Sequence, residues 1–160
     1  MPILKAGGTS ALNLSIRRAT VADIPVLMAL EKDAATAAHW SIAQYQAVFS
    51  GEGLSTVALV AEQNVVQGFI IGRVLDDEWE IENVVVAVAA RRRGLGQRLV
   101  GEFLDVASAR EAKSIFLEVR ESNLAARRLY EAWAFIEAGR RKSYYREPEE
   151  DAILYKLQPK

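Results

Sequence analysis

The chain contains no cysteine among its 160 residues and has a single histidine, His39. The absence of cysteine excludes disulfide bonds, a thiolate nucleophile and zinc sites built from cysteine. One histidine cannot form a site that needs several imidazole ligands. We therefore expect no metal ion in this protein.

Long apolar runs and an excess of one charge are also missing. The longest apolar run covers residues 84–90, far short of the ~20 residues that a membrane-spanning helix needs. The first ten residues lack the apolar core of a signal peptide. The net charge is -1 at pH 7, so no global field attracts nucleic acid or an anionic membrane. We expect a cytoplasmic protein that contacts neither directly.

The composition is that of one globular domain. Apolar residues make up 51% of the chain and charged residues 26%, which is ordinary for a protein with a single sizeable core. Residues 1–12 are small, contain glycine and show no period, so we expect a flexible N-terminal tail. Residues 13–160 then form the domain, which we expect to be a monomer or a weak dimer.

Periodicity of the apolar residues predicts the elements of this domain. Seven segments have the pattern of strands, namely 14–17, 56–61, 65–74, 79–88, 115–120, 135–144 and 152–157. Four segments have apolar residues at helical spacing, namely 24–34, 41–49, 94–107 and 122–133. The order predicts a mixed α/β domain.

Polar residues mark where the helices begin. Asp23 is placed to cap the first helix, with Pro25 in its first turn. Ser41 is placed to cap the second, and Ser122 or Asn123 the last.

The segment from Arg91 to Gly96 lies between a valine-rich strand and a helix. Free backbone N–H groups and the positive end of the helix dipole point to one spot there. Two glycines allow a phosphate to approach the backbone closely. A basic surface turn explains the same residues, and their spacing leaves both readings open. A nucleic-acid patch is the weaker alternative because no aromatic residue interleaves the arginines.

Arg91-x-x-Gly94-x-Gly96 resembles the acetyl-CoA signature of the GNAT superfamily of N-acetyltransferases. Further blocks are similar to the bacterial ribosomal-protein-alanine N-acetyltransferases within it. These are Leu117-Glu118-Val119-Arg120-x-Ser122-Asn123-x-x-Ala126-x-x-Leu129-Tyr130-Glu131, Arg140-Arg141-x-x-Tyr144-Tyr145, Glu150-Asp151-Ala152 and Trp40-Ser41. The resemblance covers about residues 14 to 157.

The resemblance implies an α/β (α+β) fold with a mixed, mostly antiparallel seven-stranded sheet and about four helices. Such a sheet splays open between its fourth and fifth strands, and coenzyme A lies in the opening. The residues that the resemblance places on acetyl-CoA are Val84, Val85, Val86, Arg91, Arg92, Arg93, Gly94, Leu95, Gly96, Gln97 and Asn123. It places Trp40, Tyr144 and Tyr145 around the acceptor groove.

Glu118 corresponds to the general base of the family and Tyr130 to its general acid. Acyl transfer to an amine needs a group that removes a proton and one that protonates the leaving thiolate. Plainer roles are open for each residue. Glu118 can be a solvated strand residue, Tyr130 a packing aromatic and Asn123 only a helix cap.

The resemblance implies an enzyme that transfers the acetyl group of acetyl-CoA directly to a protein N-terminus, with a ribosomal protein alanine as the usual acceptor. Acetylation of lysine side chains or of a small-molecule amine is the alternative. A non-catalytic acetyl-CoA-binding module is a further one.

The chain departs from the family pattern at three places. Val88 and Ala134 stand where the family often has proline and glycine, and Ala37-Ala38-His39 lacks a Phe-Pro often found there. If position 134 needs a positive φ, alanine costs about 1 kcal/mol. The change before Trp40 bears on the acceptor side of the site.

Overall fold

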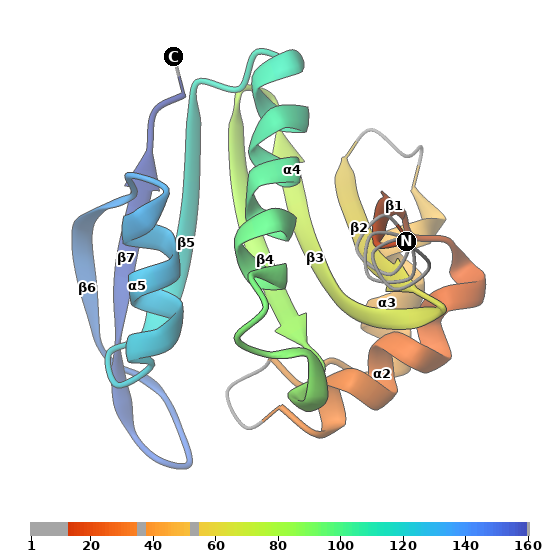
Figure 1. Ribbon diagram of the computed structural model, residues 1–160. Helices are drawn as coiled ribbons and strands as arrows, with labels where there is room; N and C mark the ends of the chain where they lie inside the picture. Colours follow the sequence, from red (N-terminus) through yellow and green to blue (C-terminus); the bar gives the residue numbers. More distant parts are fainter. Residues whose placement is uncertain (1–12, 35–37, 52–54, 160) are drawn as a thin grey trace, which may run out of the picture.

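The computed structural model describes residues 13–34, 38–51 and 55–159 (Figure 1). The expected tail, residues 1–12, lies outside the described residues. The strands are β1 (Ser15–Arg18), β2 (Thr56–Gln63), β3 (Val65–Leu75), β4 (Glu78–Val86), β5 (Ser114–Arg120), β6 (Ile136–Tyr145) and β7 (Glu150–Leu157). The helices are α2 (Ile24–Lys32), α3 (Ile42–Ser50), α4 (Leu95–Ala109) and α5 (Leu124–Ala132), with 3-10 turns η1 (Val21–Asp23) and η2 (Val88–Ala90).

The seven strands form one sheet in the order β1-β2-β3-β4-β5-β7-β6. All neighbouring pairs are antiparallel except β4 and β5, which run parallel. The register of this parallel pair joins residues 78–80 to residues 114–116. Beyond them the two strands diverge (Figure 1). The expected mixed sheet, splayed between its fourth and fifth strands, is confirmed.

Two apolar cores sandwich the sheet. On one face α4 and α5 pack through a core that contains Trp79, Phe103 and Tyr130. On the other face α2 and α3 pack through a core that contains Tyr45 and Phe69. Burial of this apolar surface on both faces is the main stabilising contribution to the fold. Residues of both diverging strands, β4 and β5, meet in the core under α4 and α5.

The strand predicted for 79–88 is two residues too long, because β4 ends at Val86. Val88 lies in η2 and is exposed. The apolar run continues through this turn without a glycine or proline, so composition gives no signal for the strand end. The last strand starts earlier than predicted, at Glu150.

Two predicted helix caps are confirmed. Ser41 Oγ accepts a hydrogen bond from the backbone N–H of Gln44 at 3.2 Å. Asn123 Oδ1 accepts one from the backbone N–H of Ala126 at 3.2 Å. Each satisfies a helix N–H that has no partner within the helix.

The prediction for Asp23 is wrong in its chemistry. Asp23 precedes α2, but its side chain makes no cap hydrogen bond to that helix. It accepts instead from Arg17 Nη1 and Nη2 at 2.9 and 3.0 Å and from the backbone N–H of Thr20 at 2.7 Å. A bidentate guanidinium competes well for a carboxylate, and the sequence spacing could not show that Arg17 lies within reach.

Candidate active site

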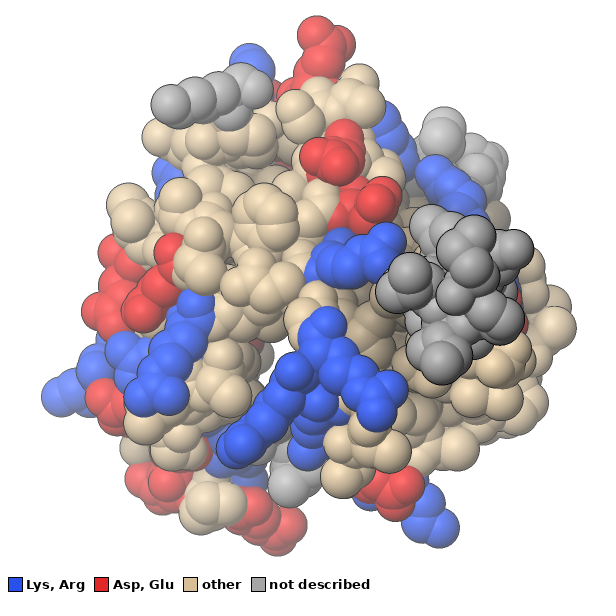
Figure 2. All heavy atoms as spheres, viewed as in Figure 1, with Lys and Arg blue, Asp and Glu red and all other residues tan. Residues whose placement is uncertain are grey.

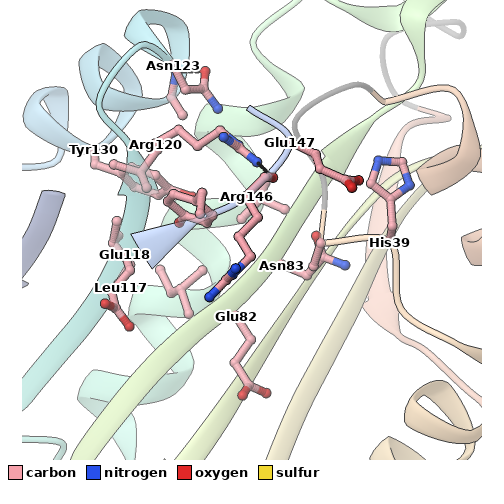
Figure 3. Close-up of a pocket in the computed structure, with 16 residues that line it drawn as sticks. His39, Glu82, Asn83, Leu117, Glu118, Arg120, Asn123, Tyr130, Arg146 and Glu147 are labelled. Carbon is pink, nitrogen blue, oxygen red and sulfur yellow. Dashed lines mark hydrogen bonds between the residues drawn. The ribbon is translucent and has the colours of Figure 1, made fainter. Parts of the chain in front are cut away.

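Where β4 and β5 diverge, a cavity of about 550 Å³ opens between them (Figure 3). We call it the central cleft. Its size is in the range of small-molecule sites. Its lining residues come from β4, β5, α5, the segment before Trp40 and the turn after β6, and they are Ala38, His39, Ile81, Glu82, Asn83, Val84, Leu117, Glu118, Val119, Arg120, Asn123, Ala126, Tyr130, Tyr145, Arg146 and Glu147.

Glu118 lines this cleft from the middle of β5. Its neighbours Leu117 and Val119 alternate into the buried core, so the carboxyl group faces the other way. The Glu118 side chain is 16% exposed, and Arg141 Nε lies 2.5 Å from its Oε2. Oε2 is buried and accepts no hydrogen bond from the described residues. Glu118 is thus a half-buried carboxyl group with one cationic neighbour.

Tyr130 lines the same cleft from the last turn of α5. The end of this helix is fixed by bonds from Phe135 N to Tyr130 O at 3.1 Å and from Ala134 N to Glu131 O at 3.0 Å. This is the Schellman arrangement, which places the residue after the cap at positive φ. Ala134 has φ 72°, so the position that often holds glycine does need this conformation.

The Tyr130 side chain is held by burial and by an aromatic contact. It is 6% exposed, and its ring packs edge-on against Phe135 at 5.7 Å between centroids. Burial, and then the nearby Tyr145, raise its pKa above the ordinary value of 10.0. The hydroxyl therefore keeps its proton throughout the neutral range.

A second cavity lies where α4 begins, and we call it the α4 pocket. It is lined by Val86, Ala90, Arg91, Arg92, Gly94, Leu95, Gly96, Gln97, Ala125, Arg128 and Leu129. On β4, Val84 lines the central cleft and Val86 lines the α4 pocket. On α5, Ala126 lines the central cleft and Ala125 lines the α4 pocket. The two cavities therefore flank the same stretch of β4 and α5.

The backbone at the start of α4 presents free donors to this pocket. Gly94 has φ 78°, a conformation that glycine adopts without strain. The first helical bond after it runs from Arg98 N to Gly94 O at 3.0 Å. The amides of Leu95, Gly96 and Gln97 precede that bond, so they have no partner within the helix. A Cβ on Gly96 would lie 3.4 Å from Leu129 Cδ2, so α5 lies close to the start of α4.

The arginines of the loop divide into two kinds. Arg91 and Arg92 line the α4 pocket, whereas Arg93 does not. Arg128 of α5 also lines it, although this residue was not among those expected from the sequence. Residues 125, 128 and 129 lie on one face of a helix because they are three and four positions apart. This spacing is the feature of the sequence from which Arg128 could have been predicted. Figure 2 shows basic side chains gathered at the centre of this face, over the segment between β4 and α4.

The three valines at the end of β4 have different surroundings. Val84 and Val86 are partly buried toward the cavities, while Val85 is buried in the opposite core. In the described register this stretch pairs with β3 and not with β5. Its second edge therefore faces the opening, where backbone groups are available to a ligand. Asn123, besides capping α5, lines the central cleft.

The aromatic residues expected at the acceptor side are brought together only in part. Tyr145 lines the central cleft, but Tyr144 is 50% exposed and packs on Tyr145 with ring centroids 5.2 Å apart. The Trp40 ring contacts Tyr45 at 5.4 Å and is not among the residues that line the cleft. Its neighbour His39 lines the cleft instead.

Acidic groups lie along the narrow end of the opening. Glu82 lines the central cleft and forms an ion pair with Arg73 at 2.5 Å. Burial, and then the charge of Glu82, raise the pKa of Glu80 above its ordinary value. Within the described ranges, no three His, Cys, Asp or Glu side chains are grouped to hold a metal ion. No described helix is long and apolar enough to cross a membrane.

The model of the acetyltransferase (GNAT) family matches residues 24–135. The chain is 38% identical over 109 residues to the ribosomal protein bS18-alanine N-acetyltransferase of Salmonella typhimurium, covering 67% of this chain and 73% of that protein. It is 40% identical over 91 residues to the Escherichia coli K12 protein of the same name, covering 56% of this chain and 62% of that one.

A solved structure shows the same similarity in three dimensions. The crystal structure of the Escherichia coli ribosomal-protein-S18-alanine N-acetyltransferase superimposes with a TM-score of 0.82 at 31% sequence identity. The superposition covers 91% of this chain and 94% of that one. The two proteins therefore share one fold over nearly their whole length.

Proposed function

The chain belongs to the acetyltransferase (GNAT) family, and we propose that it transfers the acetyl group of acetyl-CoA to the α-amino group of a protein N-terminus. The acceptor that we propose is the N-terminal alanine of ribosomal protein S18. The names of the bacterial relatives support this acceptor. Because ribosomal proteins are made in the cytoplasm, we place the reaction there.

The observation that carries the proposal is the meeting of three features in one cleft. Glu118 lines it from β5, Tyr130 from α5, and the free edge of β4 at Val84 lies opposite them. Acyl transfer to an amine needs a base, an acid and a polar group that orients the carbonyl. The cleft offers all three within one cavity.

The α4 pocket fits the diphosphate of the donor. A diphosphate needs several N–H donors and positive charge around it. The amides that precede the first bond of α4 supply the donors, and Arg91, Arg92 and Arg128 supply the charge. Val84, Val85 and Val86 then hold the donor's arm through their backbone groups, and Asn123 contacts it from α5.

Bound acetyl-CoA supplies a thioester, whose carbonyl carbon forms the new bond to the acceptor nitrogen as the C–S bond breaks. Glu118 accepts the proton that the amine must lose. Tyr130, protonated at neutral pH, donates a proton to the departing sulfur. With no cysteine in the chain, direct transfer between the two substrates is favoured over an acyl-thiol intermediate on the protein.

Two other functions use the same residues. One keeps the acetyl donor and takes a lysine side chain or a small-molecule amine as acceptor. The other is a non-catalytic module that binds acetyl-CoA, against which the presence of Glu118 and Tyr130 in one cleft argues.

Mass spectrometry of an S18 N-terminal peptide incubated with the protein and acetyl-CoA tests the proposal. We expect one added acetyl group on the α-amine, and none when that amine is blocked beforehand. Acetylation of lysine or of amine panels, without the N-terminus, would favour the first alternative. Tight binding of acetyl-CoA with no transfer to any acceptor would favour the second.

A further inference from the structure

Glu31, near the end of α2, is only 2% exposed. An acidic side chain is seldom so buried unless it is paired, yet no ion pair reaches Glu31 from the residues that the structure describes. Its Oε1 accepts a hydrogen bond from the backbone N–H of Trp40 at 2.8 Å, and its Oε2 accepts one from Asn83 Nδ2 at 2.7 Å. Both oxygens thus join α2 to other parts of the chain.

Both partners adjoin residues that line the central cleft. Asn83, 5% exposed, lines the cleft and immediately precedes Val84 of the β4 edge. Trp40 follows Ala38 and His39, which also line the cleft. Figure 3 shows His39 and Asn83 entering the pocket from separate segments of the chain. Glu31 is therefore a tie between the strand and the segment 38–40.

The strand does not need this tie, but the segment 38–40 does. Asn83 is held in β4 by its register with Ile71 of β3. Residues 38–40 belong to no helix or strand, so no ladder of backbone bonds fixes them. Loss of the Glu31 carboxyl group would consequently free the backbone of this segment, while the Trp40 ring still packs on Tyr45 and the sheet stays in place.

The hydrogen bond from Trp40 to Glu31 acts on the backbone conformation of His39. This histidine has φ 55°, which is uncommon for a residue with a side chain and persists only where neighbouring contacts fix the backbone. The next backbone N–H along the chain belongs to Trp40, and it donates a hydrogen bond to Glu31 Oε1. The bond thus fixes the backbone of His39 on its C-terminal side.

We propose that Glu31 is a positioning residue for the acceptor, which holds the Trp40 amide and so keeps His39 in the cleft wall that the acceptor peptide passes. This rests on the proposed function. The α4 pocket, which takes the diphosphate, draws on none of these residues, and the β4 stretch that holds the donor's arm is fixed by its pairing with β3, so we expect donor binding to be unaffected by loss of the tie.

Two substitutions of Glu31 separate the hydrogen bonds from general destabilisation. Glu31→Met keeps the length of the side chain and removes both acceptor oxygens. Glu31→Gln keeps a carbonyl oxygen for the Trp40 N–H, and its NH2 group donates to Asn83 once that side-chain amide turns its oxygen toward it. We expect Glu31→Met to raise KM for the N-terminal peptide about tenfold, with the acetyl-CoA dissociation constant unchanged. Glu31→Gln should stay close to the wild type.

Asp23→Leu is the matched control, because Asp23 is also a buried acid beside α2 but bonds Arg17, away from the cleft. It should lower thermal stability without raising the peptide KM. A double-mutant cycle with His39→Ala then tests the route. If Glu31 acts through His39, Glu31→Met should add little to the effect of His39→Ala.

Hydrogen exchange at the Trp40 amide gives a readout that needs no acceptor. We expect at least tenfold faster exchange in Glu31→Met than in the wild type. Unchanged exchange, an unchanged peptide KM or strictly additive effects in the cycle would overturn the inference while leaving the proposed function intact. If the wild-type protein transferred acetyl groups to no peptide, the proposed function would be contradicted, and with it the role of Glu31 in positioning the acceptor.

Discussion

Arg141 Nε lies 2.5 Å from Glu118 Oε2, although the two residues stand on strands separated by β7. Arg141 is well exposed, whereas Glu118 is half-buried. The partner thus reaches in from solvent, across the sheet, to the carboxyl group that we propose as the base. An incoming ammonium group can take the place of this guanidinium without leaving the carboxylate unpaired.

Replacing Glu118 by glutamine should remove the proton acceptor and leave the shape of the cleft. We expect kcat to fall by about 10²–10⁴-fold, with acetyl-CoA binding measured by calorimetry unchanged. Glu121→Gln is the matched control, since Glu121 also pairs with an arginine of β6, Arg140 at 2.7 Å, and lies outside the lining of the cleft. Full turnover of Glu118→Gln would refute its role as the base.

Tyr130→Phe should lower kcat by a similar factor, because the hydroxyl is the proposed proton donor. Tyr155→Phe is the control, since Tyr155 is buried beneath α5 and bonds Glu131 and Arg127 but does not line the cleft. Turnover by Tyr130→Phe at the wild-type rate would exclude this role.

The same residue sets an expectation for pH. A raised pKa means that the acid form persists to higher pH, and the proposed donor works only in that form. The kcat profile should therefore show no decline from Tyr130 below its ordinary pKa of 10.0. An alkaline decline near pH ~8 that disappears in Tyr130→Phe would contradict this assignment.

Gly96→Val should raise the acetyl-CoA KM strongly. A Cβ at this position already lies 3.4 Å from Leu129 Cδ2, so two further methyl groups must enter the α4 pocket or push α5 away. We expect about a tenfold weaker affinity or more, whereas Gly96→Ala should have a small effect. Equal and small effects of both variants would show that the donor does not approach the backbone here.

Arg128 and Arg93 form a matched pair of exposed arginines, of which only Arg128 lines the α4 pocket. Arg128→Ala should weaken acetyl-CoA binding several-fold, less so at high salt because the contact is a charge on a phosphate. Arg93→Ala should have little effect. If Arg93 matters as much as Arg128 or the glycines, charge around the loop dominates over its shape.

Ala134→Gly should stabilise the protein by about 1 kcal/mol, because Ala134 has φ 72° after the end of α5. Denaturant titration should show the midpoint rising with an unchanged slope. Ala38→Gly, at a position that does not have a positive φ, should not stabilise. A loss of stability in Ala134→Gly would mean that packing of the methyl group outweighs the backbone strain.

Local signals in the sequence predicted much of this structure. The caps at Ser41 and Asn123 depend only on residues three positions apart, and the periodicity of each element depends on its own side chains. The opening between β4 and β5 came from the resemblance, since no local pattern shows where two strands separate.

Contacts between distant segments could not be predicted in this way. Arg141 reaches Glu118 only because β6 and β5 both pair with β7. The Asp23 carboxylate binds Arg17 and does not cap α2. Glu31 did leave a signal, since it falls on the apolar stripe of α2, seven positions after Ile24. A charged residue on such a stripe must find buried partners, but its spacing does not say which.

The parallel register of residues 78–80 with residues 114–116 joins two parts of the sheet, one of four strands and one of three. β1 to β4 form one curved antiparallel half of the sheet, and β5, β7 and β6 form the other antiparallel half (Figure 1). The described backbone bonds between the halves lie in this short seam and at Asp77 beside it, whose carbonyl accepts from Lys113 and Ser114. Side chains of α4 and α5 therefore hold the two halves at their angle. The width of the opening is therefore a property of packing, which substitutions far from any reacting atom can adjust.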